Sequence, residues 1–311
     1  MFVLSRRGLL IGLAACAATG AATGGAAYGM VEHSVLPGKY ELNRLLGACG
    51  SDPGVPRVAA GPVVARTFYS RYRRRTVNMF IMRPPGRLGA LPVTLVLHGA
   101  GADAAAAVAL GYPQYLAAAI AAGISPFAAV AVDGGSATYW HPRSDSDDPQ
   151  GMLIYEVLPR LRQQGYHVAK IGLAGWSMGG YGALLLAARL GPPSNTPSTG
   201  TGTGTGVAAV AVSSPAIFAS YADASTANPG SFDSPADFAA NDIQSAANVA
   251  VLRQIPTRID CGSNDPFAPQ DLLLQRALGD PANRVTNGCH DNAFFRRNLP
   301  AQLAFLGQHL A

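Results

Sequence analysis

Short apolar runs alternate along the chain with longer segments in which apolar and polar residues mix. Several runs are almost continuously apolar, as in residues 127–132 and 207–212, which is typical of parallel strands that helices cover on both faces. The mixed segments have the spacing and the closing glycines of helices. Strand and helix segments follow each other in turn, and this order predicts an α/β fold with a mostly parallel central sheet and helices on both faces.

The predicted elements begin with a hairpin, because two strand-like segments flank the arginine-rich stretch 71–75. Residues 149–165 predict one amphipathic helix closed by Gly165, with Tyr155 among its apolar positions. The expected strands lie within residues 65–70, 77–84, 91–101, 127–135, 169–180, 207–215, 255–267 and 282–292. The expected helices lie within residues 113–123, 149–165, 181–191, 234–243, 269–279 and 293–310.

The length of 311 residues fits one large domain that follows a leader, with two small domains as the alternative. We expect the leader in residues 1–30, an entry segment in 31–60 and the α/β domain in 61–311. Within this domain, residues 193–206 are a Pro, Ser, Thr and Gly tract that cannot bury a core. We interpret this tract as a flexible surface loop, and the irregular stretch 214–250 as a candidate lid.

The first thirty residues resemble an export signal. Arg6 and Arg7 precede a modestly apolar run, as in twin-arginine signals, which send folded proteins across a membrane; a chance pair of arginines is the alternative. The mature N-terminus stays open, because Cys16 fits a lipidation site, the small residues up to Ala27 fit ordinary cleavage, and an uncleaved run would be a weak membrane anchor. We expect an exported protein, secreted or attached to the cell envelope or membrane.

Charged residues make up only 13% of the chain, and the formal net charge is +5. Nearly all positive charges are arginines, with lysine only at Lys39 and Lys170. Apart from the run at 71–75 these arginines are scattered, whereas nucleic-acid-binding proteins concentrate basic residues on one face. We therefore expect no nucleic-acid partner.

The segment from Gly175 to Gly179, GWSMG, fits the pattern G-x-S-x-G. The pattern alone is weak in a chain with 36 glycines, but here an apolar strand leads into it and a helix begins directly behind it. This is the setting of a nucleophile elbow, and the helix N-terminus favours negative charge that develops there. We predict Ser177 as a nucleophile, with a buried, hydrogen-bonded serine in a Gly-rich turn as the alternative.

A serine hydroxyl needs a histidine base and an orienting carboxylate to act as a nucleophile near neutral pH. In this kind of sheet they follow the serine in the order acid, then histidine. Only His290 and His309 lie downstream of Ser177. His309 stands two residues from the C-terminus at the end of a helix, so His290, in the turn-like loop before the last helix, is the predicted base.

Two carboxylates lie near the end of a late predicted strand, Asp260 inside it and Asp265 in the loop that follows. Asp265 is preferred, because the carboxylate has to stand at the carboxyl end of its strand to meet the imidazole. An Asx turn is the alternative role of Asp265. Asp291 adjoins His290 in the sequence, and its side chain would have difficulty folding back onto its neighbour's ring.

Acyl transfer also needs donors for an oxyanion, best supplied by two fixed backbone N–H groups. We predict the amides of Met178, directly after the nucleophile, and of Ala100, which lies between glycines after an apolar strand. His98, Tyr139 and Trp140 follow strands at the same edge of the sheet and are candidates for the substrate pocket. Plain packing is an equally good interpretation of the two aromatic residues, and a structural role of the histidine.

Four cysteines are present. If Cys16 belongs to the leader, then Cys49, Cys261 and Cys289 remain, and an odd number leaves one of them unpaired. A bridge between Cys261 and Cys289 would join two loops that carry candidate catalytic residues. Buried free thiols are the alternative, and the pairing stays open.

The segments LVLHGAG, GLAGWSMGGYGAL, DCGSNDPF and GCHDNAFFRRNLPAQLAFL, in this order, resemble the esterase family of α/β-hydrolases that includes esterase D, S-formylglutathione hydrolase and the trehalose mycolyltransferases. The resemblance extends from about residue 68 to the C-terminus. It implies an α/β-hydrolase fold, a triad of Ser177, Asp265 and His290, and an oxyanion hole formed by the two amides named above.

The chain departs from this family in the low-complexity insert and in the segment DGGSATYWHPR. At the position of His98 the mycolyltransferases typically have an aspartate that faces the sugar, which puts trehalose recognition in doubt. An exported location also argues against a cytosolic role in formaldehyde detoxification.

These observations predict an exported serine hydrolase that cleaves a small-molecule or lipid carboxylic ester through an acyl-enzyme intermediate. One alternative is an acyltransferase with a sugar or lipid alcohol as acceptor, and another is a non-catalytic envelope protein on a hydrolase fold. The sequence contains no metal-ligand constellation or nucleotide-binding loop that competes for the site, so we expect no cofactor and no metal.

Overall fold

The computed structural model describes residues 39–87, 89–193, 204–280, 282 and 284–311. The chain divides into two units, Met1–Cys49 and Gly50–Ala311. The described part of the first unit contains the short helix α3 (Lys39–Leu45), in which Arg44 pairs with Glu41. The predicted leader, residues 1–30, and most of the predicted loop 193–206 lie outside the described residues.

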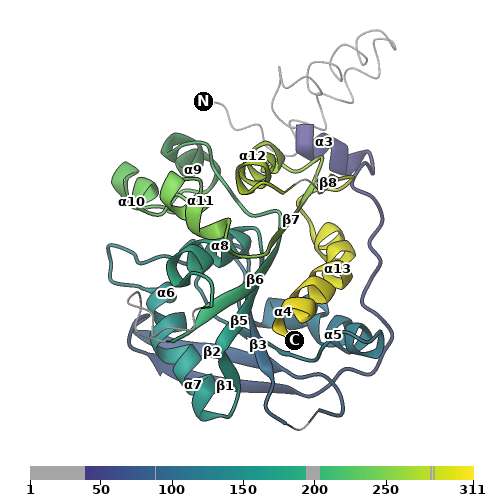
Figure 1. Cartoon of the computed structure of the whole chain (residues 1–311). Coiled ribbons are helices and arrows are strands. Elements are labelled where there is room, and N and C mark those ends of the chain that lie inside the picture. Colours follow the sequence, from purple (N-terminus) through teal and green to yellow (C-terminus); the bar gives the residue numbers. More distant parts are fainter. Residues whose placement is uncertain (1–38, 88, 194–203, 281, 283) are drawn as a thin grey trace. The chain divides into compact units, whose positions relative to one another are not determined.

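The second unit is built on an eight-stranded sheet in the order β1-β2-β4-β3-β5-β6-β7-β8 (Figure 1). β1 and β2 form the predicted antiparallel hairpin, β2 pairs antiparallel with β4, and the other pairs are parallel. The strands are β1 (Val63–Ser70), β2 (Arg75–Met82), β3 (Pro92–Leu97), β4 (Ala128–Val132), β5 (His167–Trp176), β6 (Gly206–Ser213), β7 (Thr257–Gly262) and β8 (Val285–Thr286). The predicted α/β fold class with a mostly parallel sheet is confirmed.

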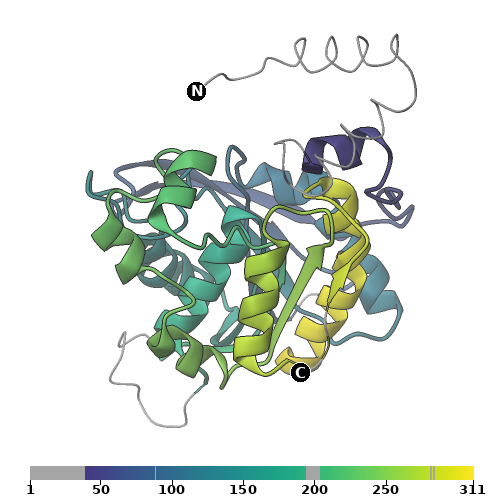
Figure 2. The same cartoon turned by 90° about the horizontal axis from the view of Figure 1, so that it is seen from above.

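Helices cover both faces of this sheet, with α4, α5 and α13 on one face and α6, η1, α7 and α8 on the other (Figures 1 and 2). Their bounds are α4 (Ala105–Leu110), α5 (Tyr112–Ala121), α6 (Pro149–Met152), the π-helix η1 (Leu153–Val157), α7 (Leu158–Gln163), α8 (Met178–Leu190), α12 (Ala268–Leu278) and α13 (Asn292–Leu310). Two apolar cores result. Leu95 and Leu97 of β3 face one core and Val96 the other, because successive strand residues point to opposite sides. No helix in the described part of the chain is both long and apolar enough to span a membrane.

The stretch 214–250, predicted as a candidate lid, contains three short helices between β6 and β7: α9 (Tyr221–Ala227), α10 (Pro235–Ala240) and α11 (Ala246–Leu252). Each begins behind a serine whose side chain accepts a hydrogen bond from the backbone three residues later, at Ser220, Ser234 and Ser245, and such caps satisfy N–H groups that have no partner inside the helix. α11 packs on α8 and buries Leu252 in the core. The stretch is therefore an ordered helical layer, and its action as a lid stays a prediction.

The helix predicted over residues 149–165 is interrupted in the structure. It begins as α6, widens into η1 and continues as α7. Pro159 has no N–H to donate to the carbonyl of Tyr155, so the regular hydrogen-bond ladder cannot pass this point. Tyr155 is 42% exposed, while Val157 and Leu161 are buried. A core position for Tyr155, which its apolar spacing indicates, is therefore wrong.

Candidate active site

Ser177 lies in the sharp turn between β5 and α8. Its backbone angles, φ 55° and ψ −126°, belong to a region that residues with a side chain rarely adopt. The last residue of β6 and the loop after it fix this conformation, because the Ser177 amide donates to the Ser213 carbonyl at 3.0 Å and the Ser177 carbonyl accepts from the Ala216 amide at 3.0 Å. The hydroxyl therefore projects from a turn that its neighbours hold in place.

Two glycines allow the backbones of β3, β5 and α8 to meet at this turn. A Cβ at Gly179 would lie 2.0 Å from the carbonyl oxygen of Leu97, and a Cβ at Gly175 would lie 2.4 Å from the carbonyl oxygen of Gly179. Both distances are shorter than any tolerated contact, so no side chain fits. The glycines of the G-x-S-x-G pattern are thus required by close backbone approach.

The structure brings together the three side chains that the sequence predicts as a catalytic group. The Ser177 hydroxyl lies 2.9 Å from Nε2 of His290, and Nδ1 of the same ring lies 2.8 Å from Oδ2 of Asp265. The residues come from the loops after β5, β7 and β8, which end at one edge of the sheet. Phe267 and Phe295 contact the His290 ring edge-on, so packing fixes its orientation.

Asp265 is fully buried. Its second oxygen, Oδ1, accepts a hydrogen bond from the Phe267 amide at 2.9 Å, so both carboxylate oxygens have a partner, as a buried charge requires. A carboxylate that faces Nδ1 favours the tautomer with the proton on Nδ1 and leaves Nε2 free to accept the serine proton. The His290 side chain is 27% exposed, whereas Asp265 behind it is fully buried.

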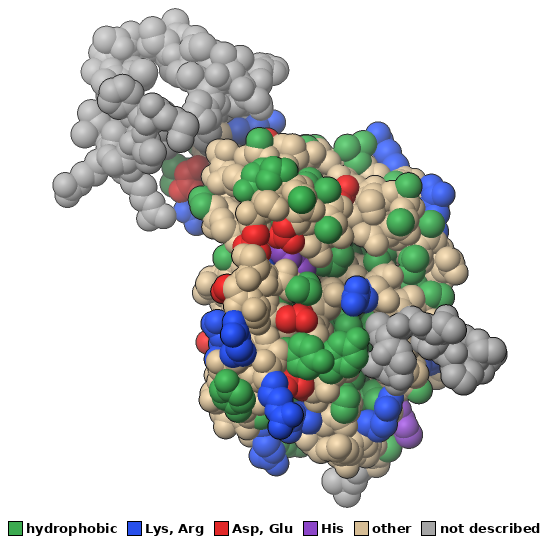
Figure 3. Space-filling view, turned by 90° about the vertical axis from the view of Figure 1, so that its left-hand side faces the viewer, with side chains coloured by type: hydrophobic (Ala, Val, Ile, Leu, Met, Phe, Trp, Pro, Cys, Tyr) green, Lys and Arg blue, Asp and Glu red, His purple; other side chains and the backbone are tan. Residues whose placement is uncertain are grey.

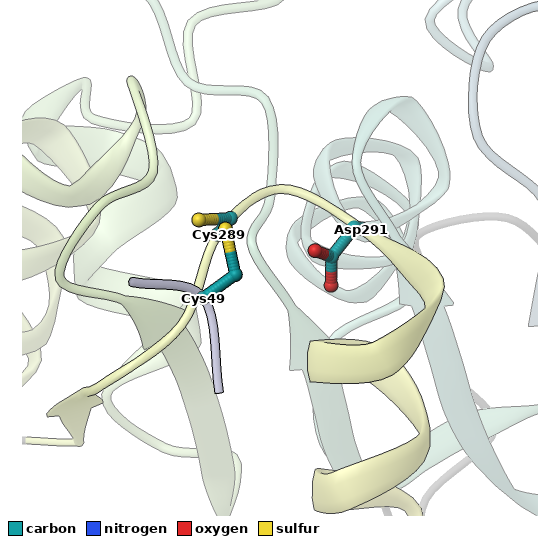
Figure 4. A group of neighbouring side chains, drawn as sticks. All are labelled: Cys49, Cys289 and Asp291. Atoms are coloured by element: carbon teal, nitrogen blue, oxygen red, sulfur yellow. The ribbon is translucent and has the colours of Figure 1, made fainter. Parts of the chain in front are cut away.

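The alternative carboxylates are occupied elsewhere. Asp260 accepts hydrogen bonds from Arg258 and Gln302. Asp291 lies at the start of α13 and caps it by accepting a hydrogen bond from the Phe294 amide at 2.8 Å (Figure 4). The other downstream histidine, His309, bonds through Nδ1 to a carbonyl oxygen of its own helix. The preference for Asp265 over its neighbours agrees with this geometry.

The loop after β3 lies directly behind the nucleophile. A Cβ at Gly99 would lie 3.2 Å from Cβ of Ser177, a contact that the sequence pattern does not reveal. The Gly101 amide donates to another loop, whereas the amides of Ala100 and Met178 donate no backbone hydrogen bond among the described residues. The Met178 amide belongs to the first turn of α8, where N–H groups have no partner inside the helix. Both predicted donors are therefore free, and their role stays a prediction.

His98 connects two loops through both nitrogens of its ring. The ring is buried, Nε2 accepts a hydrogen bond from the Gly134 amide at 2.9 Å, and Nδ1 bonds to the Gly99 carbonyl oxygen at 2.9 Å. Burial lowers the pKa of His98, so the ring stays neutral. The predicted position of His98 in the substrate pocket is corrected, because both ring nitrogens are used by the backbone.

Tyr139 and Trp140 are likewise packed inside the molecule, each about 1% exposed. Trp140 fills the space that the missing side chain of Gly182 leaves, where a Cβ would lie 2.4 Å from Cβ of the tryptophan. Burial raises the pKa of Tyr139 to about 12. The aromatic rings around Tyr139 are those of Tyr181, Phe218 and Phe232. Packing is thus the role that the structure gives both side chains, in place of the predicted pocket wall.

The cysteines differ from the predicted bridge. Cys49 and Cys289 are disulfide-bonded (Figure 4), while Cys261 is a buried free thiol. A bridge between Cys261 and Cys289 is therefore wrong. Cys261 is fully buried on β7, and burial raises the pKa of its thiol. Disulfide sulfur is not a thiolate, so Cys49 and Cys289 offer no ligand to a metal in this state.

Solved structures of similar fold come from several esterases. A ferulic acid esterase has a TM-score of 0.65 and 18% identity, and the similarity covers 81% of this chain and 100% of the other. An S-formylglutathione hydrolase from Agrobacterium tumefaciens has a TM-score of 0.63 and 14% identity, over 84% and 100% of the two chains. A thermostable esterase from Pseudomonas putida has a TM-score of 0.60 and 19% identity, over 90% and 92%.

No protein-family model matches the chain, and no curated protein matches its sequence. At identities below 20% the similarity to these solved structures shows the fold alone. It confirms the predicted α/β-hydrolase fold.

Proposed function

We propose that this protein is a serine hydrolase that cleaves carboxylic esters. The observation that carries the proposal is the hydrogen-bonded series of Ser177, His290 and Asp265, with Ser177 on a strained turn at a helix N-terminus. A nucleophile, a base and a residue that orients the base form the arrangement that acyl transfer requires. The names of the structural neighbours, several of them esterases, also support the proposal.

In the proposed reaction, Ser177 Oγ attacks the acyl carbon while Nε2 of His290 takes the hydroxyl proton. The buried Asp265 carboxylate stabilises the resulting imidazolium, and the amides of Ala100 and Met178 donate to the oxyanion. The tetrahedral intermediate collapses, the C–O bond of the ester breaks, and His290 gives its proton to the leaving alcohol. Water then attacks the acyl-serine with His290 as base, releases the carboxylic acid and restores Ser177.

Hydrolysis of 4-nitrophenyl acetate by the wild type, Ser177→Ala and His309→Ala tests this proposal. We expect Ser177→Ala to lose about 10³-fold or more of kcat, because the acyl-enzyme cannot form. His309→Ala, a change of a histidine outside the site, should retain the wild-type rate. Equal rates for the wild type and Ser177→Ala would overturn the proposal. Adding an alcohol such as trehalose and analysing the products distinguishes hydrolysis from acyl transfer to a sugar.

We also propose that the protein is exported through its twin-arginine-like leader. Arg6 and Arg7 stand before an apolar run, and the two disulfide-bonded cysteines support the proposal, since structural disulfides persist in oxidising compartments outside the cytosol. Replacing both arginines by lysine should retain the protein in the cytoplasm on cell fractionation. Unchanged export of this variant would contradict the twin-arginine route.

A further inference from the structure

A cavity of about 400 Å³ lies beside the turn of the β1–β2 hairpin. Its walls come from the end of β1, the hairpin turn, η1 and α7. The lining residues that matter below are Tyr69, Arg71, Tyr72, Tyr155, Glu156 and Gln163. None of these belongs to the site around Ser177, so the cavity is a separate feature of the molecule.

The cavity shares an edge of the sheet with Ser177 but lies far from it. The hairpin turn extends past Val132, the last residue of β4, and therefore stands at the carboxyl ends of the parallel strands, where the Ser177 turn also lies. β1 is four strands from β5 in the sheet. At about 4.8 Å between neighbouring strands, the two places are roughly 19 Å apart.

Exposed aromatic rings form one part of the cavity. Tyr72 and Tyr155 stack with ring centroids 5.4 Å apart and planes 21° from parallel. Tyr155 is 42% exposed and Tyr69 is 59% exposed. Figure 3, which shows the left-hand side of the molecule in Figure 1, has hydrophobic side chains next to basic and acidic ones in its lower half. Tyr155 lies in the π-helix η1, and short π-helical segments occur frequently at functional sites.

Polar groups complete the cavity. Glu156 fixes the hairpin turn, because its carboxylate accepts hydrogen bonds from the Ser70 hydroxyl at 2.5 Å and the Arg71 amide at 2.9 Å. The guanidinium of Arg71 makes no hydrogen bond or ion pair within the described part of the chain. Gln163, also exposed, adds an amide group. The polar ends of Arg71 and Gln163 therefore lie beside the aromatic rings of the cavity, and Glu156 fixes the conformation of the hairpin turn.

We propose that this cavity binds a carbohydrate. The aromatic faces would pack against the apolar C–H face of a sugar ring, while Arg71 and Gln163 would bond to its hydroxyl groups. An apolar ligand would leave these polar groups without partners, which costs free energy. Two arginines line the cavity, Arg71 and Arg160, the latter with its guanidinium over the Phe68 ring. Glu156 offsets one of the two positive charges, and the single net charge that remains is not a basic groove of the kind that nucleic acids require.

The position of the cavity also indicates a class of substrate for the proposed esterase. This part of the inference rests on the proposed function. An ester whose alcohol part is a sugar chain can place its ester bond at Ser177 while a distant sugar unit occupies the cavity. Binding at the cavity would then lower KM for long sugar esters and leave small esters unaffected. Binding of the free sugar itself does not depend on the proposed catalysis.

Calorimetric titration of the full chain with xylohexaose, cellohexaose and maltohexaose tests the proposal, in a Ser177→Ala background that prevents turnover. We expect at least one of the three to bind, with an affinity that Tyr155→Ala weakens roughly tenfold. Tyr155→Phe keeps the stacked ring and should bind as the parent does. Tyr40→Ala, which removes an exposed tyrosine outside the cavity, is the matched control and should also bind normally.

The proposal is overturned if none of the three sugars binds at millimolar concentration, or if Tyr155→Ala binds as tightly as its parent. Arg71→Ala provides a second test, because it alters the polar side of the cavity without touching the stacked rings, and it should also weaken binding. Hydrolysis of 4-nitrophenyl acetate by the protein with Ser177 intact tests the proposed function separately. If the protein does not hydrolyse this ester but binds a sugar in a way that depends on Tyr155, the proposed esterase function is contradicted and the proposed sugar site is supported.

Discussion

Ser177 has a backbone conformation that costs on the order of 1–3 kcal/mol where nothing compensates for it. The hydrogen bonds of its amide to the end of β6 and of its carbonyl to the loop that follows offset this cost. Asp265 and His290 are restrained in a similar way, the first by a backbone amide and the second by two aromatic rings. Each group of the site is therefore positioned before any substrate arrives.

Asp265→Asn tests the role of the buried carboxylate. The amide nitrogen of asparagine favours the histidine tautomer that carries its proton on Nε2, which cannot accept the proton of Ser177. We expect kcat to fall by about 10⁴-fold with little change in KM, measured on a small chromogenic ester. A loss of less than tenfold in correctly folded protein would assign the orienting role to another group.

The three residues Ser177, Asp265 and His290 could be predicted from the sequence because each stands in a loop after a strand segment, and the order serine, acid, histidine along the chain fixes which loops meet. The burial of His98, Tyr139 and Trp140 could not be predicted in the same way. Their surroundings depend on contacts between distant segments, such as Trp140 against Gly182. The sequence pattern therefore placed these three residues at the correct edge of the sheet, but it did not show that their side chains are buried.

Among the elements, the β1–β2 turn shows how a run of like charges can be structural. Arg73 is 1% exposed and donates to both carboxylate oxygens of Asp147 and, at 2.6 Å, to the carbonyl oxygen of Asp133. Its neighbours Arg71 and Arg74 are exposed. The arginine-rich stretch thus anchors the hairpin to the loop after β4 instead of forming a uniform basic surface.

Asp147→Ala should destabilise the protein by about 3–5 kcal/mol, because it leaves the buried Arg73 guanidinium without its carboxylate. The free energy of unfolding in urea measures this change. Asp145→Ala, at an exposed position two residues away, should cost less than about 1 kcal/mol. Equal stabilities of the two variants would show that the buried pair is not needed to hold the turn.

The first turn of α12 carries a buried carboxyl group that the proposed reaction does not use. Asp271 is fully buried, and the thiol of Cys261 is the group that faces its carboxyl. Burial is the main reason that the pKa of Asp271 is raised well above its usual range, and the charge of Asp265 raises it further. Asp271 therefore keeps its proton at pH values where an exposed aspartate has lost it.

Asp271→Asn should change how stability depends on pH. In the unfolded chain the carboxyl loses its proton near pH 4, whereas the folded protein keeps it up to the raised pKa. Between these limits the folded state binds one proton more, so the stability of the wild type falls as pH rises. The variant lacks this slope. Melting temperatures of both proteins across this range should diverge as pH increases, and parallel curves would contradict a protonated Asp271.

The second unit is built on a mostly parallel sheet, and the parallel pairing brings the ends of β5, β7 and β8 to one edge. This arrangement could be predicted, because almost continuous apolar runs separated by helices allow few other folds. The π-helix η1 could not, since a regular helix fits the same apolar spacing. The pairing of the cysteines could not be predicted from the sequence either, because three cysteines allow several pairings and only the fold decides which sulfurs meet.

Reduction of the disulfide-bonded cysteines Cys49 and Cys289 should lower the free energy of unfolding. Breaking a disulfide typically lowers the free energy of unfolding by about 2–4 kcal/mol, and urea unfolding with and without dithiothreitol measures this difference. In folded, oxidised protein, the thiol of Cys261 should resist alkylation, because it is buried and its pKa is raised. Rapid alkylation of Cys261, or equal stability of oxidised and fully reduced protein, would contradict this expectation.

Covalent labelling by a fluorophosphonate probe tests the proposed nucleophile most directly, because the probe reacts only with a serine whose hydroxyl is activated. Mass spectrometry of the digested protein should find the probe on Ser177, and the label should disappear in Ser177→Ala and fall strongly in His290→Ala. The absence of label on Ser177 in folded wild-type protein, or equal labelling of the wild type and Ser177→Ala, would contradict a serine hydrolase.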